Sequence, residues 1–148
     1  MIQIKTGKSK IRRKKMEDTE REIWVGENRF HLGEDDILYI STVGEIDDKL
    51  AVEFIKALRS FDKFPKIGGK RDVLVDINKG GKTSPRARKL FIETCEQEET
   101  GKVAMFGLHP VSRVLASFLI GVTAKKDMRF FKTKYEALAW LKESKRDE

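Results

Sequence analysis

The sequence predicts an α/β fold, with a mostly parallel sheet of about five strands, an N-terminal antiparallel hairpin and four helices. Short apolar runs typical of buried strands alternate with segments whose apolar residues recur every three or four positions, as in amphipathic helices. Capping and turn residues stand between most of these segments. Because strands that alternate with helices are joined by right-handed crossovers, most of the sheet should be parallel.

The N-terminal part of the domain is predicted to form a hairpin and a helix. Residues 23–32 and 37–43 have the composition of strands, and the turn-rich residues 33–36 between them favour an antiparallel hairpin. Asp47 is expected to cap the first helix, which ends before Pro65. The apolar stripe of this helix consists of Leu50, Ala51, Phe54, Ile55 and Leu58.

The middle of the chain is predicted to form a buried strand, a loop and a second helix. The strand covers residues 73–77, and the glycine- and lysine-rich residues 78–83 are expected to form the loop. Ser84 is expected to cap the helix, with Pro85 at its first position. Cys95 is the single cysteine of the chain. It is expected to be a packed core thiol, because it lies on the apolar side of this helix with Ala87, Leu90 and Phe91.

The C-terminal part carries the clearest alternation of strand and helix. Residues 103–106 form an apolar strand, Pro110 starts a helix that runs to residue 122, and residues 128–131 form the next strand. Thr133 and Glu136 are spaced as a capping box for the last helix. The 3.6-residue period of the helix at 110–122 predicts an inward stripe formed by Val111, Val114, Leu115, Phe118, Leu119 and Val122.

The charge of the chain is concentrated at its N-terminus. The net charge is +7, and residues 1–15 contain seven Lys and Arg side chains and no acid, so the rest of the chain is balanced. We therefore expect a basic, flexible tail over residues 1–21 and one domain over residues 22–145. The tail could bind nucleic acid only non-specifically, through residues 5–15. One cysteine and the lack of an apolar run of about 20 residues predict a cytoplasmic protein without a membrane span.

The loop before Ser84 contains the strongest chemical motif. Gly81-Lys82-Thr83 matches the end of a phosphate-binding P-loop, but Asp76 stands where the first glycine is required, which argues against nucleotide hydrolysis. Two interpretations remain: a flexible turn with a good cap, or a helix N-terminus that holds an anion or a phosphorylated hydroxyl. The second would use Thr83, Ser84, Lys82 and Arg86.

No catalytic set, metal site or cofactor site is predicted. His31 and His109 are far apart in the sequence, and no group of His, Cys, Asp and Glu has the spacing of metal ligands. Asp76, at the end of a strand, is either a catalytic carboxylate or an anchor for the loop that follows it.

The helix at 110–122 is apolar on more than one side. A helix exposed to solvent normally has a polar back, so this helix is either covered by the rest of the domain or contacts a partner or ligand. The residues expected to form such a contact surface are Pro110, Arg113, Ser117 and Ile120.

Two C-terminal segments resemble a known family. The Pro110-Val111-Ser112-Arg113 helix start and the closing Ala137-Leu138-Ala139-Trp140-Leu141 piece are similar to the C-terminal half of SpoIIAA-like, or STAS-like, domains. The resemblance covers roughly residues 23–142 and implies a βα superhelix without an enzyme active site. It also implies a fold related to lipid-exchange CRAL-TRIO-type domains.

The resemblance implies a regulatory role. STAS-like domains act as anti-sigma-factor antagonists or regulatory modules and are switched by phosphorylation at a helix start, which corresponds here to Thr83 or Ser84. Lys82-Thr83-Ser84-Pro85 stands where that family has an Asp-Ser-Ser-Gly type of signature. We expect a non-enzymatic module that binds a protein partner or forms a homodimer. The alternative is a protein that binds lipid or another small apolar ligand.

Overall fold

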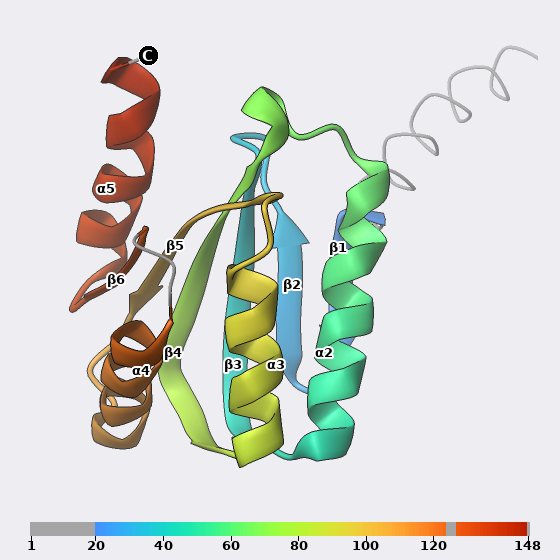
Figure 1. Cartoon of the computed structure of the whole chain (residues 1–148), viewed down its shortest axis with the longest axis vertical. Helices are drawn as coiled ribbons and strands as arrows, with labels where there is room; N and C mark the ends of the chain where they lie inside the picture. Colours follow the sequence, from blue (N-terminus) through green and yellow to red (C-terminus); the bar gives the residue numbers. More distant parts are fainter. Residues whose placement is uncertain (1–19, 124–126, 148) are drawn as a thin grey trace, which may run out of the picture.

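The strands of the central sheet follow one another in space in the order of the sequence (Figure 1). The structure, a computed structural model, describes residues 20–123 and 127–147. Six strands form one sheet in the order β1 to β6. Their bounds are Glu22–Val25 for β1, Asn28–Leu32 for β2, Ile37–Ile46 for β3, Arg71–Thr83 for β4, Thr100–Phe106 for β5 and Met128–Phe131 for β6.

The pairing confirms the predicted fold class. Strands β1, β2 and β3 pair antiparallel, and β3, β4, β5 and β6 pair parallel. The predicted strand at residues 23–32 is two strands, because the chain turns at Gly26, whose φ of 61° suits glycine. The antiparallel end of the sheet therefore contains one strand more than the sequence indicated.

The predicted loop at residues 78–83 is wrong, because these residues continue β4. Lys79, Gly80 and Thr83 pair with residues of β3. The two strands approach closely here: a Cβ on Gly81 would lie 3.0 Å from the carbonyl carbon of Gly44. The glycine that suggested a loop is thus required by close strand packing. Because the segment is extended and paired with β3, it does not form the wrapped phosphate cradle of a P-loop.

Four α-helices cover the two faces of the sheet unequally. They are α2 (Asp48–Ser60), α3 (Pro85–Cys95), α4 (Pro110–Val122) and α5 (Lys134–Asp147). Helices α2, α3 and α4 lie side by side over one face (Figure 1). On the other face, α5 packs through Ala137, Trp140 and Leu141 against a cluster formed by Ile37, Leu74, Ala104 and Phe106.

Local capping signals set the helix starts. The Asp47 side chain accepts a hydrogen bond from the N–H of Leu50 at 2.7 Å and so begins α2 as predicted. The predicted Thr133 cap of α5 is also present, with the N–H of Glu136 bonded to the Thr133 hydroxyl at 3.3 Å. Two short 3-10 helices, Phe61–Lys63 and Ile67–Gly69, connect α2 to β4.

The predicted inward stripe of α4 is wrong for three of its residues. Val111, Val114 and Phe118 are exposed, whereas Leu115, Ala116, Leu119 and Ile120 pack toward the sheet. The helix is apolar on most sides, so two stripes with the same 3.6-residue period compete, and only packing against the sheet decides between them. The consequence is an apolar surface on the outside of the molecule.

Candidate functional site

The N-termini of α2 and α3 meet at the carboxyl ends of β3 and β4. The backbone N–H of Ser84 donates to the carbonyl of Ile46 at 2.9 Å, which joins the two strand exits. Asp47 caps α2 immediately after β3, and Ser84 caps α3 immediately after β4. Because each helix starts directly after one of two neighbouring parallel strands, the two helix N-termini, each the positive end of a helix dipole, lie next to each other.

The Ser84 side chain makes two hydrogen bonds at this edge. Its hydroxyl accepts a hydrogen bond from the N–H of Ala87 at 3.1 Å, as an N-cap does, and donates one to Oδ1 of Asp48 at 2.5 Å. The contact with Asp48 joins residues 36 positions apart in the sequence. The sequence predicted the role of Ser84 but not its partner, because Asp48 is recognisable in the sequence only as an acidic residue in the first turn of a helix.

The other residues of the predicted anion site are placed differently. Thr83 is half-buried at the end of β4, where it pairs with Ile46. Lys82 and Arg86 are exposed on either side of Thr83 and Ser84 in the chain. The structure thus brings a capping hydroxyl, an acidic neighbour and two exposed cations to one edge of the molecule.

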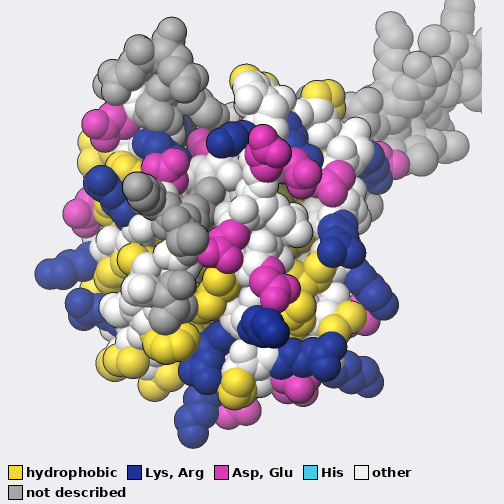
Figure 2. Space-filling model, viewed as in Figure 1, with side chains coloured by type: hydrophobic (Ala, Val, Ile, Leu, Met, Phe, Trp, Pro, Cys, Tyr) yellow, Lys and Arg dark blue, Asp and Glu magenta, His cyan; other side chains and the backbone are white. Residues whose placement is uncertain are grey.

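A second feature is the apolar surface on α4. We define the α4 apolar surface as the four exposed apolar residues of this helix and the turn before it: Leu108, Val111, Val114 and Phe118. Val114 is 72% exposed and Phe118 is 49% exposed. Figure 2 shows hydrophobic side chains gathered over the region of α4, next to Lys and Arg side chains below α3. A cluster of large apolar side chains in water is typical of an interaction site.

The Arg88 side chain borders the α4 apolar surface, and the Arg113 side chain on α4 lies against Phe130 of β6. The guanidinium of Arg88 lies 5.3 Å from the centre of the Phe118 ring, and that of Arg113 lies 5.5 Å from the Phe130 ring. The predicted contact residues Pro110, Arg113 and Ser117 are exposed on α4, whereas Ile120 is half-buried and packs against the core. Val111, Val114 and Phe118 were missed because the sequence analysis placed them on the inward stripe, and Leu108 was not assigned to any surface.

Other candidate residues have ordinary surroundings. Oδ1 of Asp76 accepts hydrogen bonds from the backbone N–H and the side-chain amide of Asn78, both at 2.9 Å, which agrees with the anchoring interpretation of Asp76. His31 lies on β2, and the backbone carbonyl of His109 accepts from Arg113. Among the described residues, no three His, Cys, Asp or Glu side chains are placed to hold a metal ion. None of the described helices is long and apolar enough to cross a membrane.

The face of the sheet beside α5 carries a polar pair. The hydroxyl of Tyr39 donates to Oδ2 of Asp35 at 2.5 Å. Burial, together with the hydrogen bond to the Asp35 carboxylate, raises the pKa of Tyr39 well above its usual range. The pair closes the turn between β2 and β3, since Oδ1 of Asp35 also accepts from the N–H of Ile37.

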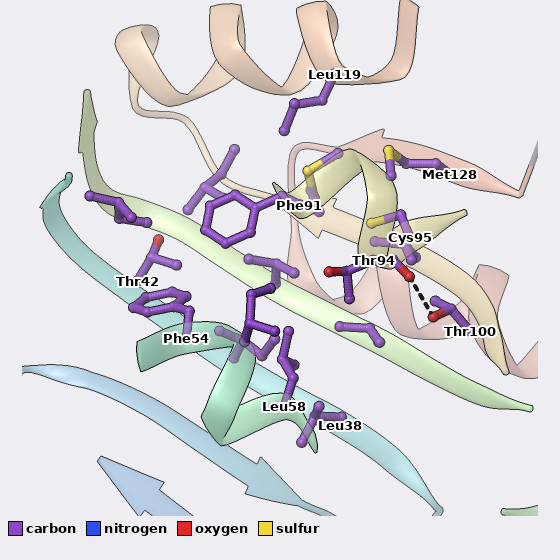
Figure 3. Close-up of a pocket in the computed structure, with 18 of the residues that line it drawn as sticks. Leu38, Thr42, Phe54, Leu58, Phe91, Thr94, Cys95, Thr100, Leu119 and Met128 are labelled. Carbon is purple, nitrogen blue, oxygen red and sulfur yellow. Dashed lines mark hydrogen bonds between the residues drawn. The ribbon is translucent and has the colours of Figure 1, made fainter. Parts of the chain in front are cut away.

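A cavity of about 200 Å³ lies between the sheet and the helices α2, α3 and α4. Figure 3 shows apolar side chains from all three helices pointing into it, among them Phe54 of α2, Phe91 of α3 and Leu119 of α4. Cys95 lines it as well, so the thiol is packed among apolar residues, as predicted, but beside a cavity. The sequence contained no signal for the cavity, because its walls are ordinary core positions of separate elements.

A domain of unknown function, DUF7793, matches residues 31–145. The chain belongs to this family. No curated protein matches the chain. The match covers β3 to β6 completely, together with the last two residues of β2 and α5 up to residue 145, and it leaves out β1.

Two solved structures are similar to the chain in fold. One is an uncharacterized DUF3478 protein with a SpoIIAA-like fold from Shewanella loihica PV-4, with a TM-score of 0.56 and 21% identity over 77% of this chain and 91% of that one. The other is the anti-sigma factor antagonist SpoIIAA in its unphosphorylated form, with a TM-score of 0.55 and 14% identity over 78% of this chain and 97% of that one. These similarities confirm the SpoIIAA-like fold that the sequence resemblance implied.

Proposed function

We propose that the protein is a non-enzymatic regulatory module that docks a protein partner on the α4 apolar surface. The observation that carries the proposal is the exposure of Val111, Val114 and Phe118 on one helix. Burying apolar surface gains about 25 cal/mol per Å² and is the main favourable term in protein association. Contiguous apolar side chains that are left in water therefore indicate a binding surface. The likeness to SpoIIAA, an anti-sigma factor antagonist, supports a regulatory role.

The charges beside the surface indicate the chemistry of the partner. The guanidinium of Arg88, on α3, lies over Phe118, and Arg113 is an exposed residue of α4 that precedes Val114 in the chain. In a two-fold symmetric dimer through this surface, the same arginines of both copies would approach each other, which opposes self-association. The partner that fits best is therefore another protein whose apolar contact residues are flanked by Asp or Glu.

Ser84 is suited to control this surface. The N–H of Arg88 bonds to the carbonyl of Ser84 at 3.0 Å, and the Arg88 side chain covers Phe118, so Ser84 is connected to the surface through one residue. A phosphate on Ser84 would add about two negative charges beside Asp48 and would replace the hydrogen bond between them with repulsion. Thr83 remains a second candidate acceptor, but it is half-buried and paired within the sheet.

The docking proposal is tested by crosslinked affinity capture from the native cells, with proteins quantified by mass spectrometry. A partner should be captured by the wild type and by Tyr135→Lys, a control at an exposed apolar residue of α5, and lost with Val114→Lys. Both substituted residues are exposed, so stability should change by no more than about 0.5 kcal/mol. Capture that is equal for Val114→Lys and wild type, or sedimentation showing a dimer that Val114→Lys abolishes, would contradict the proposal.

The switch is tested in the same experiment with Ser84→Asp and Thr83→Asp. Ser84→Asp should reduce capture of the partner at least tenfold, whereas Ser84→Ala, which removes the cap without adding charge, should retain it. Ser84→Ala is expected to lower the free energy of unfolding by about 1 kcal/mol, because the N-cap is lost. If both Asp variants leave every interaction unchanged, neither hydroxyl is a switch.

A further inference from the structure

Strand β6 forms one of the two edges of the sheet. Among the described residues it pairs with β5 and with no further strand (Figure 1). The carbonyls of Asp127 and Phe131 accept hydrogen bonds, at 2.8 and 3.2 Å, from N–H groups of β5 and of the residue that follows it. Because the backbone groups of successive residues in a strand point to alternate sides, Arg129 also faces β5. The N–H and C=O of Phe130 therefore point away from the sheet and are available to another strand.

An arginine stands on each side of this edge. On the side of α4, the guanidinium of Arg113 lies 5.5 Å from the centre of the Phe130 ring. On the side of α5, the guanidinium of Arg129 lies 5.2 Å from the centre of the Trp140 ring. Neither arginine forms an ion pair with another described residue. A guanidinium that stacks on a ring is restricted in position and still presents N–H groups to a carboxylate.

The charges at this edge favour an acidic strand over a second copy of the chain. Asp127 is the one acid from residue 127 to residue 132, whereas Arg129 and Lys132 are both basic and exposed. Strand β6 has only four residues, so an antiparallel pair of two β6 strands would bring the Arg129 side chains of both copies together on one face. Like charges at such positions are destabilising, whereas acidic side chains on an added strand would be attracted.

We propose that β6 binds an extended peptide segment with two consecutive acidic residues, which adds a strand to the sheet at this edge. Neighbouring side chains of a strand point to opposite faces, so one carboxylate meets Arg113 and the other meets Arg129. The N–H and C=O of Phe130 bond to the backbone of the segment, which is the source of affinity in strand addition. The site is separate from the α4 apolar surface, whose Phe118 contacts α3, and it does not depend on the docking proposal.

The proposal is tested by NMR titration of the ¹⁵N-labelled full chain with the peptide acetyl-Thr-Val-Glu-Glu-Val-Thr-amide. Binding should be saturable and should move the amide proton of Phe130 downfield, because this N–H gains an acceptor. The same peptide with Lys in place of both Glu should bind at least tenfold more weakly. A peptide with both glutamate nitrogens methylated keeps its charge but loses an amide that faces β6, so it should also bind at least tenfold more weakly.

Substitutions of exposed arginines separate this site from a general attraction to cations. Arg113→Gln and Arg129→Gln should each weaken peptide binding at least fivefold, whereas Arg86→Gln, at the start of α3, should leave it unchanged. Because all three side chains are exposed, the variants should fold. Val114→Lys, which alters the α4 apolar surface, should not weaken binding. The proposal is overturned by absence of saturable binding, by an unmoved Phe130 amide signal, by equal binding of either control peptide, or by unchanged binding to either Arg113→Gln or Arg129→Gln.

Discussion

At the scale of single residues, two polar contacts join parts of the chain that are distant in sequence. Ser84 donates to Asp48 at the carboxyl ends of the strands, and Arg71 pairs with Asp36 at the opposite end. The first contact is exposed, which the proposed phosphorylation of Ser84 requires. The second is buried and holds the start of β4 against the turn before β3. Arg71 also lines the cavity.

The hydroxyl of Tyr39 should make the stability of the protein vary with pH in the alkaline range. Its pKa in the folded protein is raised above the value of about 10 expected in the unfolded chain. The unfolded state therefore loses its proton first, so the contribution of Tyr39 to the free energy of unfolding should be fully present below about pH 10 and fall as the pH rises further. Tyr39→Phe should lower this free energy by about 1 kcal/mol at pH 7, because the bond to Asp35 is lost.

Urea unfolding from pH 7 to 11 measures the effect. The difference between wild type and Tyr39→Phe should narrow above pH 10, since only the wild type carries the phenol. Tyr135→Phe is the matched control, because Tyr135 is 83% exposed and the chain has only these two tyrosines. A gap between wild type and Tyr39→Phe that stays constant over the whole range would contradict the assignment.

At the scale of elements, glycines in different surroundings should respond oppositely to the same substitution. Gly81→Ala places a Cβ 3.0 Å from the carbonyl carbon and 3.1 Å from the next backbone nitrogen of the neighbouring strand, so β3 and β4 must separate. We expect a loss of about 1–3 kcal/mol. Gly121→Ala, in α4, meets nothing within 4 Å and should stabilise the helix by about 0.5–1 kcal/mol.

Thermal and urea unfolding of both variants provide the measurement. The pair is informative because the added methyl group is identical and only its surroundings differ. Equal effects of the two substitutions on the unfolding midpoint would show that backbone contact between β3 and β4 does not limit the side chain at position 81.

The helix starts could be predicted from sequence because their signals are local. Asp47, Ser84 and Thr133 each cap a helix through a hydrogen bond to a backbone N–H three residues later in the chain. The orientation of α4 could not be predicted, because its residues are apolar on most sides and periodicity alone does not distinguish the stripes. The glycines of residues 78–83 were interpreted as a loop because the sequence does not show that β3 lies close enough to require them.

The candidate site could be predicted from the sequence only in part, for a related reason. Ser84 stands at a helix start, which the sequence shows, but its bond to Asp48 depends on α2 and α3 lying side by side. The cavity depends on even more elements, since its walls come from the sheet and three helices. Features that arise where separate elements meet leave no pattern in a single segment, whereas the elements themselves do.

At the scale of the whole molecule, the two faces of the sheet are protected unequally. Three helices share one face, and α5 alone covers the cluster of Ile37, Leu74, Ala104 and Phe106 on the other. A chain that ends at Lys132 should therefore lack a cooperative unfolding transition and should bind a hydrophobic dye, because each large apolar side chain that loses its cover forfeits about 1.5–3 kcal/mol.

A chain that ends at Glu143 is the control for this truncation. It retains Ala137, Trp140 and Leu141, the residues of α5 that pack on the sheet, and should unfold cooperatively. Circular dichroism during urea unfolding distinguishes the two chains. Cooperative unfolding of the shorter chain would show that the helices on the first face are sufficient for the fold.

The position of α5 in the sequence also has a consequence during protein synthesis. It is the last element of the domain to leave the ribosome, after all six strands have been made. Ribosomes add about 5–20 residues per second, so roughly one to three seconds separate the end of β6 from the end of α5. During that interval the nascent sheet presents Ile37, Leu74 and Phe106 without their native cover. This face is where a chaperone that recognises apolar strands would bind the growing chain.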